Sequence, residues 1–217
     1  MPVYQLDSGT WFPSPELADD EGLLAVGGDL TAERLMLAYA HGIFPWYNEG
    51  DPILWWSPNP RTVLFPQDFK ASKSLKQSIR KYNYHFRINH AFEKVIDFCS
   101  EIPRKGQEGT WLLPEMKVAY IQLNKLGYAW SVETYCEEEL VGGLYGVQSG
   151  TLFSGESMFY RQTDASKAAL YFLCLHAKQL GIELIDVQQE TSHLLSLGAK
   201  NMTRSEFLRR ITNLTSK

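Results

Sequence analysis

A carboxylate and a carboxamide lie two positions apart near the C-terminal end of the sequence. Asp186 and Gln188 belong to residues 183–188, a stretch rich in branched aliphatic side chains and too short for a helix, so we predict a central β-strand. Alternation along a strand places Leu184, Asp186 and Gln188 on one face. Buried polar groups are costly unless they have partners, so the pair is either a functional site or a hydrogen-bonded pair of the core. The residues alone leave both interpretations open.

The elements around this strand indicate an α/β layer architecture. Residues 166–180 are apolar on nearly all sides and predict a buried helix, with Asp164 as its N-cap and Gly181 as its C-terminal stop. Upstream, the segments 128–134, 139–148 and 151–159 read as strands joined by tight connections, which predicts an antiparallel meander. A capping box that begins at Thr203 starts a last helix. Strands, a central helix, another strand and a final helix are typical of an α/β domain.

The N-terminal part of the chain has a different composition. Residues 11–28 are rich in proline, glycine and acidic residues and predict extended segments and turns. Thr31 caps a predicted helix that runs to His41 and stops at Gly42. An aromatic, proline-broken region follows over residues 43–58. We therefore predict a small N-terminal domain over residues 1–63, followed by a larger domain over residues 64–217.

Residues 70–87 form the one strongly basic stretch, with six basic side chains and no acidic one. On a helix that begins near Ser72, three of the basic residues share a face opposite Leu75 and Ile79. Such a run is often just a solvated face, but the absence of interleaved acids favours an anion-binding patch, with phosphate backbone as the obvious ligand. The residues concerned are Lys73, Lys76 and Arg80, with Lys81 beside them.

The composition excludes several classes of protein. The 217 residues carry a net charge of −4, with 44% hydrophobic and 21% charged residues, which is typical of a globular protein and not of a general nucleic-acid binder. The three cysteines are widely spaced and form no Cys-x-x-Cys pair, so neither a disulfide framework nor a thiolate zinc site is expected. The histidines show no metal-ligand spacing and no Ser-His-Asp or Cys-His set. We expect no metal, no cofactor and no covalent intermediate.

The sequence also predicts a cytoplasmic protein outside the membrane. Residues 1–9 lack a signal-peptide pattern, and the most apolar run, residues 168–177, has about half the length that a bilayer requires. No long apolar heptad or exposed apolar stripe is evident, which favours a monomer.

Six motifs follow one another along nearly the whole chain, and several of them are rich in aromatic residues. They are Gly22–Leu30, Gly42–Trp46, Trp55–Pro58 with Arg61, Glu108–Trp111, Gly155–Phe159 and Leu184–Gln188. Together they resemble the leucyl/phenylalanyl-tRNA–protein transferases. The resemblance implies transfer of Leu or Phe, and less well Met, from aminoacyl-tRNA to the N-terminal Arg or Lys of a protein, which marks that protein for degradation by the N-degron pathway.

The resemblance also implies a fold. The expected architecture is α/β (α+β), with the small N-terminal domain followed by a GNAT-like acyltransferase domain that contains a mixed, largely antiparallel sheet. The pyrophosphate loop of the acetyl-CoA-dependent acetyltransferases is not found in the sequence. This argues against acetyl-CoA as the donor.

Within the motifs that carry the resemblance, we predict catalytic roles for Asp186, Gln188 and Glu156. An aminoacyl ester is already activated, so the enzyme mainly has to orient the ester and the attacking amine. An ordinary aspartate is about four pKa units more acidic than an α-amino group, which makes Asp186 a poor base, so we expect it to order Gln188, whose carboxamide positions the amine. Glu156, together with Asp186, is expected to bind the cationic side chain of the acceptor. The alternative for Glu156 is an internal ion pair with Arg161 or Lys167.

Binding roles follow in the same way. The resemblance and the local apolar chemistry suggest a pocket for the donor side chain, although the sequence alone would assign the same residues to the core. Its predicted residues are Leu144, Phe153, Met158, Leu170 and Ile185. Trp46 and Trp111 resemble family positions that meet the terminal adenosine, and Lys73, Lys76, Arg80 and Lys81 would hold acceptor-stem phosphates.

Two other functions stay open from the sequence. One is a related transferase that uses aminoacyl-tRNA for another acceptor, such as an acidic N-terminus; Glu156 and Asp186 argue against it by like-charge repulsion. The other is a binder of aminoacyl-tRNA or of degron peptides that has no catalytic activity.

Overall fold

The N-terminal part of the protein is built on a small four-stranded sheet. The computed structural model describes residues 3–101 and 112–215. The sheet has the order β1-β2-β4-β3, with β1 parallel to β2 and the other pairs antiparallel. Its strands are β1 (Tyr4–Leu6), β2 (Leu23–Gly27), β3 (Phe44–Pro45) and β4 (Leu54–Trp56), and a short 3-10 turn, η1 (Pro15–Leu17), lies between the first two. The turn-rich sequence thus contains strands that are too short to give a clear periodic pattern.

Helix α1 (Ala32–Ala40) follows this sheet's second strand and confirms the predicted cap and stop. The Thr31 side chain accepts a hydrogen bond from the Arg34 N–H. Gly42 has φ +71°, a left-handed conformation that glycine adopts without steric cost, so the helix ends there and the chain turns into β3.

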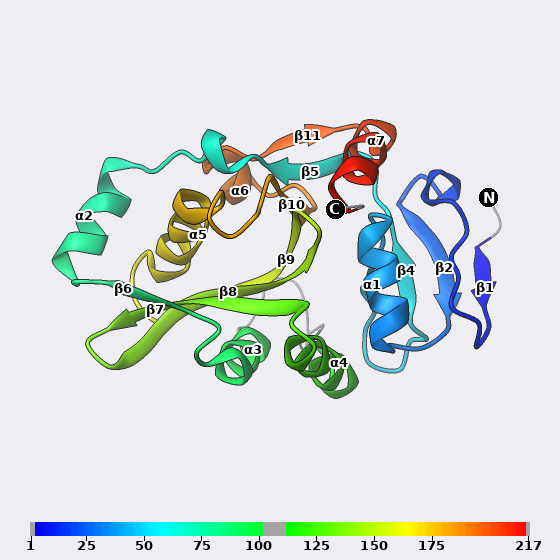
Figure 1. The fold of residues 1–217 in the computed structure, drawn as a ribbon, viewed down its shortest axis with the longest axis horizontal. Coiled ribbons are helices and arrows are strands. Elements are labelled where there is room, and N and C mark those ends of the chain that lie inside the picture. Colours follow the sequence, from blue (N-terminus) through cyan, green and yellow to red (C-terminus); the bar gives the residue numbers. More distant parts are fainter. Residues whose placement is uncertain (1–2, 102–111, 216–217) are drawn as a thin grey trace.

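A seven-stranded mixed sheet forms the larger part of the molecule (Figure 1). Its order is β11-β5-β10-β9-β8-β7-β6, and among these neighbours only β9 and β10 run parallel. The expected mixed, largely antiparallel sheet and the meander β7-β8-β9 are therefore confirmed. The strands are β5 (Arg61–Leu64), β6 (His85–Ile88), β7 (Ala129–Cys136), β8 (Glu139–Ser149), β9 (Leu152–Tyr160), β10 (Leu184–Gln188) and β11 (Lys200–Met202).

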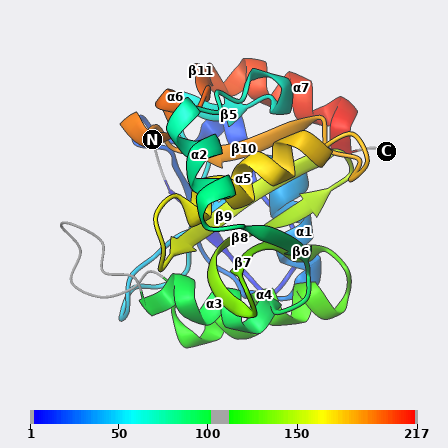
Figure 2. The ribbon, with the colours of Figure 1, turned by 90° about the vertical axis from the view of Figure 1, so that its left-hand side faces the viewer.

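Helices cover both faces of this sheet, as Figure 2 shows. Helix α5 (Ala165–His176) packs on β7, β8 and β9 from one side, and α3 (Phe92–Glu101) and α4 (Pro114–Lys125) pack from the other. Neighbouring residues of β8 face opposite ways, so that Leu144 joins the core under α5 and Tyr145 joins the core under α3 and α4. The remaining elements are α2 (Lys73–Lys81), α6 (Ser192–Ser196), α7 (Arg204–Thr215) and the 3-10 turn η2 (Pro66–Asp68).

The predicted helix over residues 166–180 is present in a shorter form, and its expected cap is wrong. Asp164 has φ +62° and makes no capping hydrogen bond with its side chain. Its carboxylate instead pairs with Lys167 at 2.8 Å and accepts a hydrogen bond from the Ser78 hydroxyl of α2 at 2.8 Å. At the last helix, the Thr203 hydroxyl accepts from the Glu206 N–H, as the capping box predicts.

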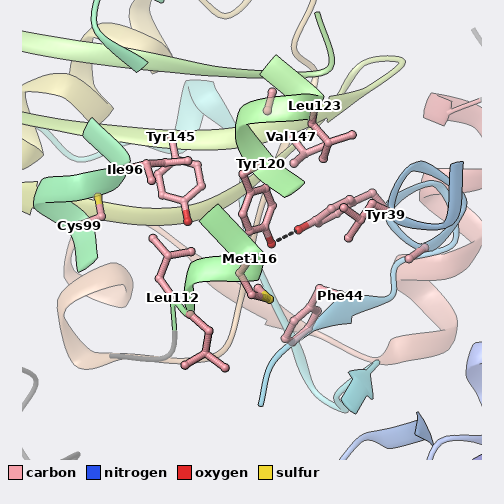
Figure 3. Close-up of a cluster of buried hydrophobic side chains, with 14 of the residues drawn as sticks. Tyr39, Phe44, Ile96, Cys99, Leu112, Met116, Tyr120, Leu123, Tyr145 and Val147 are labelled. Atoms are coloured by element: carbon pink, nitrogen blue, oxygen red, sulfur yellow. Dashed lines mark hydrogen bonds between the residues drawn. The ribbon is translucent and has the colours of Figure 1, made fainter. Parts of the chain in front are cut away.

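The two sheets share one hydrophobic core and several buried polar contacts. Tyr39 and Phe44 from the N-terminal part pack with Met116 and Tyr120 of α4 (Figure 3). On the other side of the junction, the Arg204 guanidinium of α7 donates to the Ser57 carbonyl at 2.6 Å and to a second N-terminal carbonyl, that of residue 18, at 3.1 Å. The N-terminal part is therefore fixed against the larger sheet.

The predicted boundary after residue 63 lies inside β5, which pairs with β10 and β11 of the larger sheet. We propose that the boundary falls between β4 and β5 instead. No helix among the described residues is long and apolar enough to cross a membrane.

Candidate functional site

One cavity of about 740 Å³ lies where the N-terminal part meets the larger sheet and α5. The sheet's strands β8, β9 and β10 and the helix α5 supply most of the apolar lining, and β3 with the residue after it supplies further aromatic lining. All the residues predicted for the donor pocket line this cavity: Leu144, Phe153, Met158, Leu170 and Ile185. The structure thus brings into one cavity five side chains whose positions in the sequence extend from Leu144 to Ile185, 41 positions later.

Glu156 of β9 places a carboxylate in this apolar cavity. Its Oε2 accepts a hydrogen bond from the Tyr120 hydroxyl at 2.9 Å, and its Oε1 accepts one from Gln188 Nε2 at 3.0 Å. Burial raises the pKa of the Glu156 carboxyl to about 7, and the nearby hydroxyl groups of Tyr120 and Tyr39 oppose that rise. The alternative ion pairs are absent, since Arg161 and Lys167 pair with other carboxylates. Glu156 is thus the acidic group that lines the cavity.

Asp186 is held in a buried, bidentate ion pair. Its oxygens accept hydrogen bonds from Arg61 Nε at 2.8 Å and from Arg61 Nη2 at 2.6 Å, and both side chains are almost fully buried. The guanidinium lies between the rings of Phe44 and Phe207, each 4.8 Å from its Cζ. A carboxylate occupied in this way is not free for a substrate cation. The geometry therefore argues against the expected direct contact between Asp186 and the acceptor.

Gln188 does not continue the regular alternation that the sequence predicts. The register between β10 and β5 shifts between Asp186 and Gln188, and Gln188 has φ +58°. Its backbone N–H donates to Asp186 Oδ1 at 3.0 Å. Its side chain donates to Glu156, which lies on the neighbouring strand β9. Asp186 thus contacts Gln188 through the main chain, and the carboxamide partners Glu156 rather than Asp186.

Trp46 and the four basic residues predicted for tRNA binding lie outside this polar group. Trp46 lines the cavity, and its ring packs edge-on against Trp56 with centroids 5.7 Å apart. Trp111 lies outside the described residues. Four basic side chains on α2 are exposed and, within the described chain, form no ion pair with a carboxylate: Lys73, Lys76, Arg80 and Lys81.

Several residues of the site have no sequence pattern that reveals their place in it. Tyr39 and Tyr120, which reach Glu156, are spaced like ordinary core residues of α1 and α4. Arg61 lies in a matched motif, yet nothing in that motif indicates its pairing with Asp186. Short α6 adds His193 to the cavity lining, and five residues are too few to give a helical pattern. No group of three or more metal-ligating side chains is found among the residues that the structure describes.

Two family models together match most of the chain. The model described as leucyl/phenylalanyl-tRNA protein transferase matches residues 63–212, and the model of that family's N-terminal domain matches residues 28–59. The latter match supports the expected separate N-terminal domain.

Curated relatives carry the same family name. The leucyl/phenylalanyl-tRNA–protein transferase of Syntrophobacter fumaroxidans is 53% identical over 208 residues, which cover 96% of this chain and 89% of the relative. That of Yersinia pestis is 52% identical over 217 residues, covering 99% and 91%. Among solved structures, a GCN5-related N-acetyltransferase from Kribbella flavida matches 76% of this chain and 58% of its own at 10% identity and a TM-score of 0.37. From the identities and coverage of the relatives, the chain belongs to the leucyl/phenylalanyl-tRNA–protein transferase family and is an enzyme that transfers an amino acid from aminoacyl-tRNA to protein.

Proposed function

We propose that this enzyme transfers Leu or Phe, and less well Met, to proteins that begin with Arg or Lys and so marks them for the N-degron pathway. One observation supports this most directly: a single cavity combines an apolar lining with the carboxylate of Glu156, which the Gln188 carboxamide holds by a hydrogen bond. The apolar lining suits the donor side chain, and the carboxylate suits a cationic acceptor. The expected cytoplasmic location and monomeric state stay predictions.

The donor side chain binds in the apolar part of the cavity. Leu144, Met158 and Ile185 can contact an unbranched or γ-branched side chain by dispersion, and the cavity's shape would disfavour β-branched Ile and Val. A difference of one methylene contributes only about 1–3 kcal/mol to discrimination, so the selectivity among apolar amino acids should be incomplete. The terminal adenosine would stack on Trp46 and Trp111, and the basic side chains of α2 would bind acceptor-stem phosphates.

The acceptor amine attacks the ester carbon while Gln188 and Glu156 orient it. An α-amino group has a pKa near 8, so a useful neutral fraction is present at pH 7 without a strong base. The amine nitrogen forms a bond to the carbonyl carbon, the bond from that carbon to the ribose oxygen breaks, and the amine's proton passes to that oxygen. In this scheme Asp186 fixes the backbone of Gln188, whose carboxamide also holds Glu156.

Replacing Glu156 by Gln removes the charge that we assign to acceptor binding. The KM for a peptide beginning with Arg should rise about tenfold or more, because a charge-assisted hydrogen bond contributes ~1.5–3 kcal/mol, while the KM for aminoacyl-tRNA should change little. Steady-state kinetics with each substrate varied in turn measures both values. A larger rise for aminoacyl-tRNA would refute the assignment.

The whole proposal is tested by following radiolabelled amino acids into peptides. Purified enzyme is mixed with Leu-, Phe-, Ile- or Arg-charged tRNA and with peptides that begin with Arg, Lys, Asp or Ala. Transfer of Leu and Phe, but little Ile, to the Arg and Lys peptides is expected. Transfer to Asp peptides would move the acceptor assignment to another class, and binding of charged tRNA without transfer would favour the non-catalytic function.

A further inference from the structure

A chain of buried hydroxyl groups connects the N-terminal part of the molecule to Glu156. The Tyr39 hydroxyl on α1 lies 2.7 Å from the Tyr120 hydroxyl on α4 (Figure 3), and the Tyr120 hydroxyl donates to Glu156 Oε2 at 2.9 Å. Both rings are buried, with 2% and 1% of their surface exposed. Neither is among the residues that line the cavity, and the hydrogen bond from Tyr120 to the Glu156 carboxylate connects the pair to the site.

Counting protons fixes the direction of this chain. Each tyrosine has one hydroxyl proton, and that of Tyr120 lies on the bond to Glu156, so the proton between the two tyrosines belongs to Tyr39. Gln188 Nε2 donates to the other carboxylate oxygen. Burial raises the pKa of both tyrosine hydroxyls well above its ordinary value, which keeps them protonated as donors. Tyr120 and Gln188 therefore donate to Glu156, and Tyr39 donates to Tyr120, an arrangement that favours the ionised form of Glu156.

We propose that Tyr39 is a positioning residue of the transferase, whose hydroxyl acts through Tyr120 to hold Glu156 as an oriented carboxylate. This inference rests on the proposed role of Glu156 in binding the cationic acceptor. The N-terminal part would then have a second role besides contact with tRNA, since the Tyr39 hydroxyl of α1 supports the carboxylate of the acceptor site. Tyr39 belongs to helix α1, whose N-terminus is capped by Thr31 and whose end is fixed by Gly42, so its hydroxyl has a defined position.

Of the other groups around Glu156, some raise the pKa of its carboxyl and others lower it. Asp186 raises the pKa of the Glu156 carboxyl by like charge, Arg61 lowers it, and burial is the largest cause of its rise to about 7. Tyr145 of β8 packs against Tyr120 and is among the residues that line the cavity, and His193 of α6 is another of the lining residues. Because the carboxyl titrates near neutral pH in this environment, the loss of one donor changes the fraction that is charged at pH 7.

Carboxyl 13C NMR titration tests the proposal without any dependence on catalysis. The Glu156 signal is identified by its disappearance in Glu156→Gln, and its midpoint is then measured in the wild type, Tyr39→Phe and Tyr120→Phe. We expect the midpoint to rise by about 0.5–1 pH unit in Tyr120→Phe and by a smaller, measurable amount in Tyr39→Phe. Tyr47→Phe is the matched control, because Tyr47 is a buried N-terminal tyrosine whose hydroxyl donates to a different carboxylate, Glu115. Equal midpoints in all these proteins would overturn the proposal.

Kinetics then separates positioning from general loss of structure. In Tyr39→Phe the KM for an Arg-beginning peptide should rise at pH 7 and recover at pH 8.5, with little change in kcat, whereas damaged packing would not recover with pH. Tyr39→Phe should have no further effect in the Glu156→Gln background. An equal effect in both backgrounds would show that Tyr39 does not act through Glu156. If wild type fails to use Arg peptides, the proposed acceptor fails, but the NMR result still decides the role of Tyr39.

Discussion

At the scale of single residues, Asp186 and Arg61 depend on each other for their burial. Each carries a charge in a place with almost no solvent, so the loss of one leaves the other without a partner. Asp186→Asn should lower the free energy of unfolding by about 3 kcal/mol, and Arg61→Met in the same protein should restore part of it, since no buried charge then remains. Urea denaturation measures both changes.

The exposed pair of Arg87 and Glu138 gives the control for that experiment. Glu138 is 86% exposed, so Glu138→Gln should cost less than about 1 kcal/mol. If Asp186→Asn is as harmless as this control, the buried pair does not stabilise the fold in the way we describe. The result also matters for kinetics, because low activity of Asp186→Asn can come from lost structure instead of lost chemistry.

Glu156 should make stability depend on pH. Its pKa is raised from 4.5 to about 7, so between these values the folded protein holds a proton that the unfolded chain has lost, and stability falls as the pH rises through this window. At ~1.36 kcal/mol per unit the loss is at most about 3 kcal/mol. Glu156→Gln should therefore be more stable than wild type at pH 8 and gain little at pH 4.5. Parallel stability curves of the two proteins would contradict the raised pKa.

The structure brings the apolar residues and the acidic group Glu156, which the resemblance and the local chemistry suggested, into one cavity. Their roles there stay predictions. Tyr39 and Tyr120 could not be found, because their contact joins positions 81 apart and no pattern along the chain connects them. The pairing of Arg61 with Asp186 was missed for the same reason, and it changes the expected role of the aspartate.

At the scale of elements, helix α2 is a basic surface fixed to the rest of the molecule. Leu75 is buried beneath it, and Ser78 binds Asp164 at the start of α5, so the basic side chains face solvent on a rigid support. Lys76→Gln with Arg80→Gln should weaken the binding of all aminoacyl-tRNAs alike and reduce the slope of log affinity against log salt by about 1–2. Binding measured at several salt concentrations tests this expectation.

Two lysines elsewhere give the control for α2. Lys94 of α3 and Lys125 of α4 are exposed on the helices that cover the other face of the sheet, and their replacement by Gln removes the same total charge. This control should leave tRNA binding nearly unchanged. A loss that depends on which amino acid the tRNA carries would count against a phosphate contact.

Elements with clear patterns were predicted well, and most of the short strands were not. The meander and α1 follow from alternation and caps, and β10 follows from its run of branched aliphatic residues. The short strands β2, β3 and β11 have no comparable pattern and form only because a neighbouring strand pairs with them. The bend at Gln188 has a similar origin, since a register shift depends on the partner strand.

At the scale of the whole molecule, the two sheets should unfold together. A shared core and the buried contacts of Arg204 join them. We expect tryptophan fluorescence, which reports mainly on the N-terminal part, and far-UV circular dichroism to give one coincident transition in urea. Separate transitions would show that the two parts are independent.

Arg204→Met tests which contacts produce this coupling. It removes the donor to two buried carbonyls, those of Ser57 and residue 18, so we expect a loss of about 2–4 kcal/mol in the free energy of unfolding. Arg209→Met on the exposed side of the same helix should change stability by less than about 1 kcal/mol. A loss that does not exceed this control's would mean that the shared core alone holds the parts together.

The pairing of Arg61 with Asp186 also sets an order in time. The two residues are 125 positions apart, and at about 5–20 residues per second the ribosome needs roughly 6–25 seconds to add the second after the first. During that interval the Arg61 guanidinium has no carboxylate partner with which it could be buried. Helix α7, whose Arg204 binds the N-terminal part, has not yet been synthesised either. The complete fold therefore forms only once synthesis has passed β10 and α7.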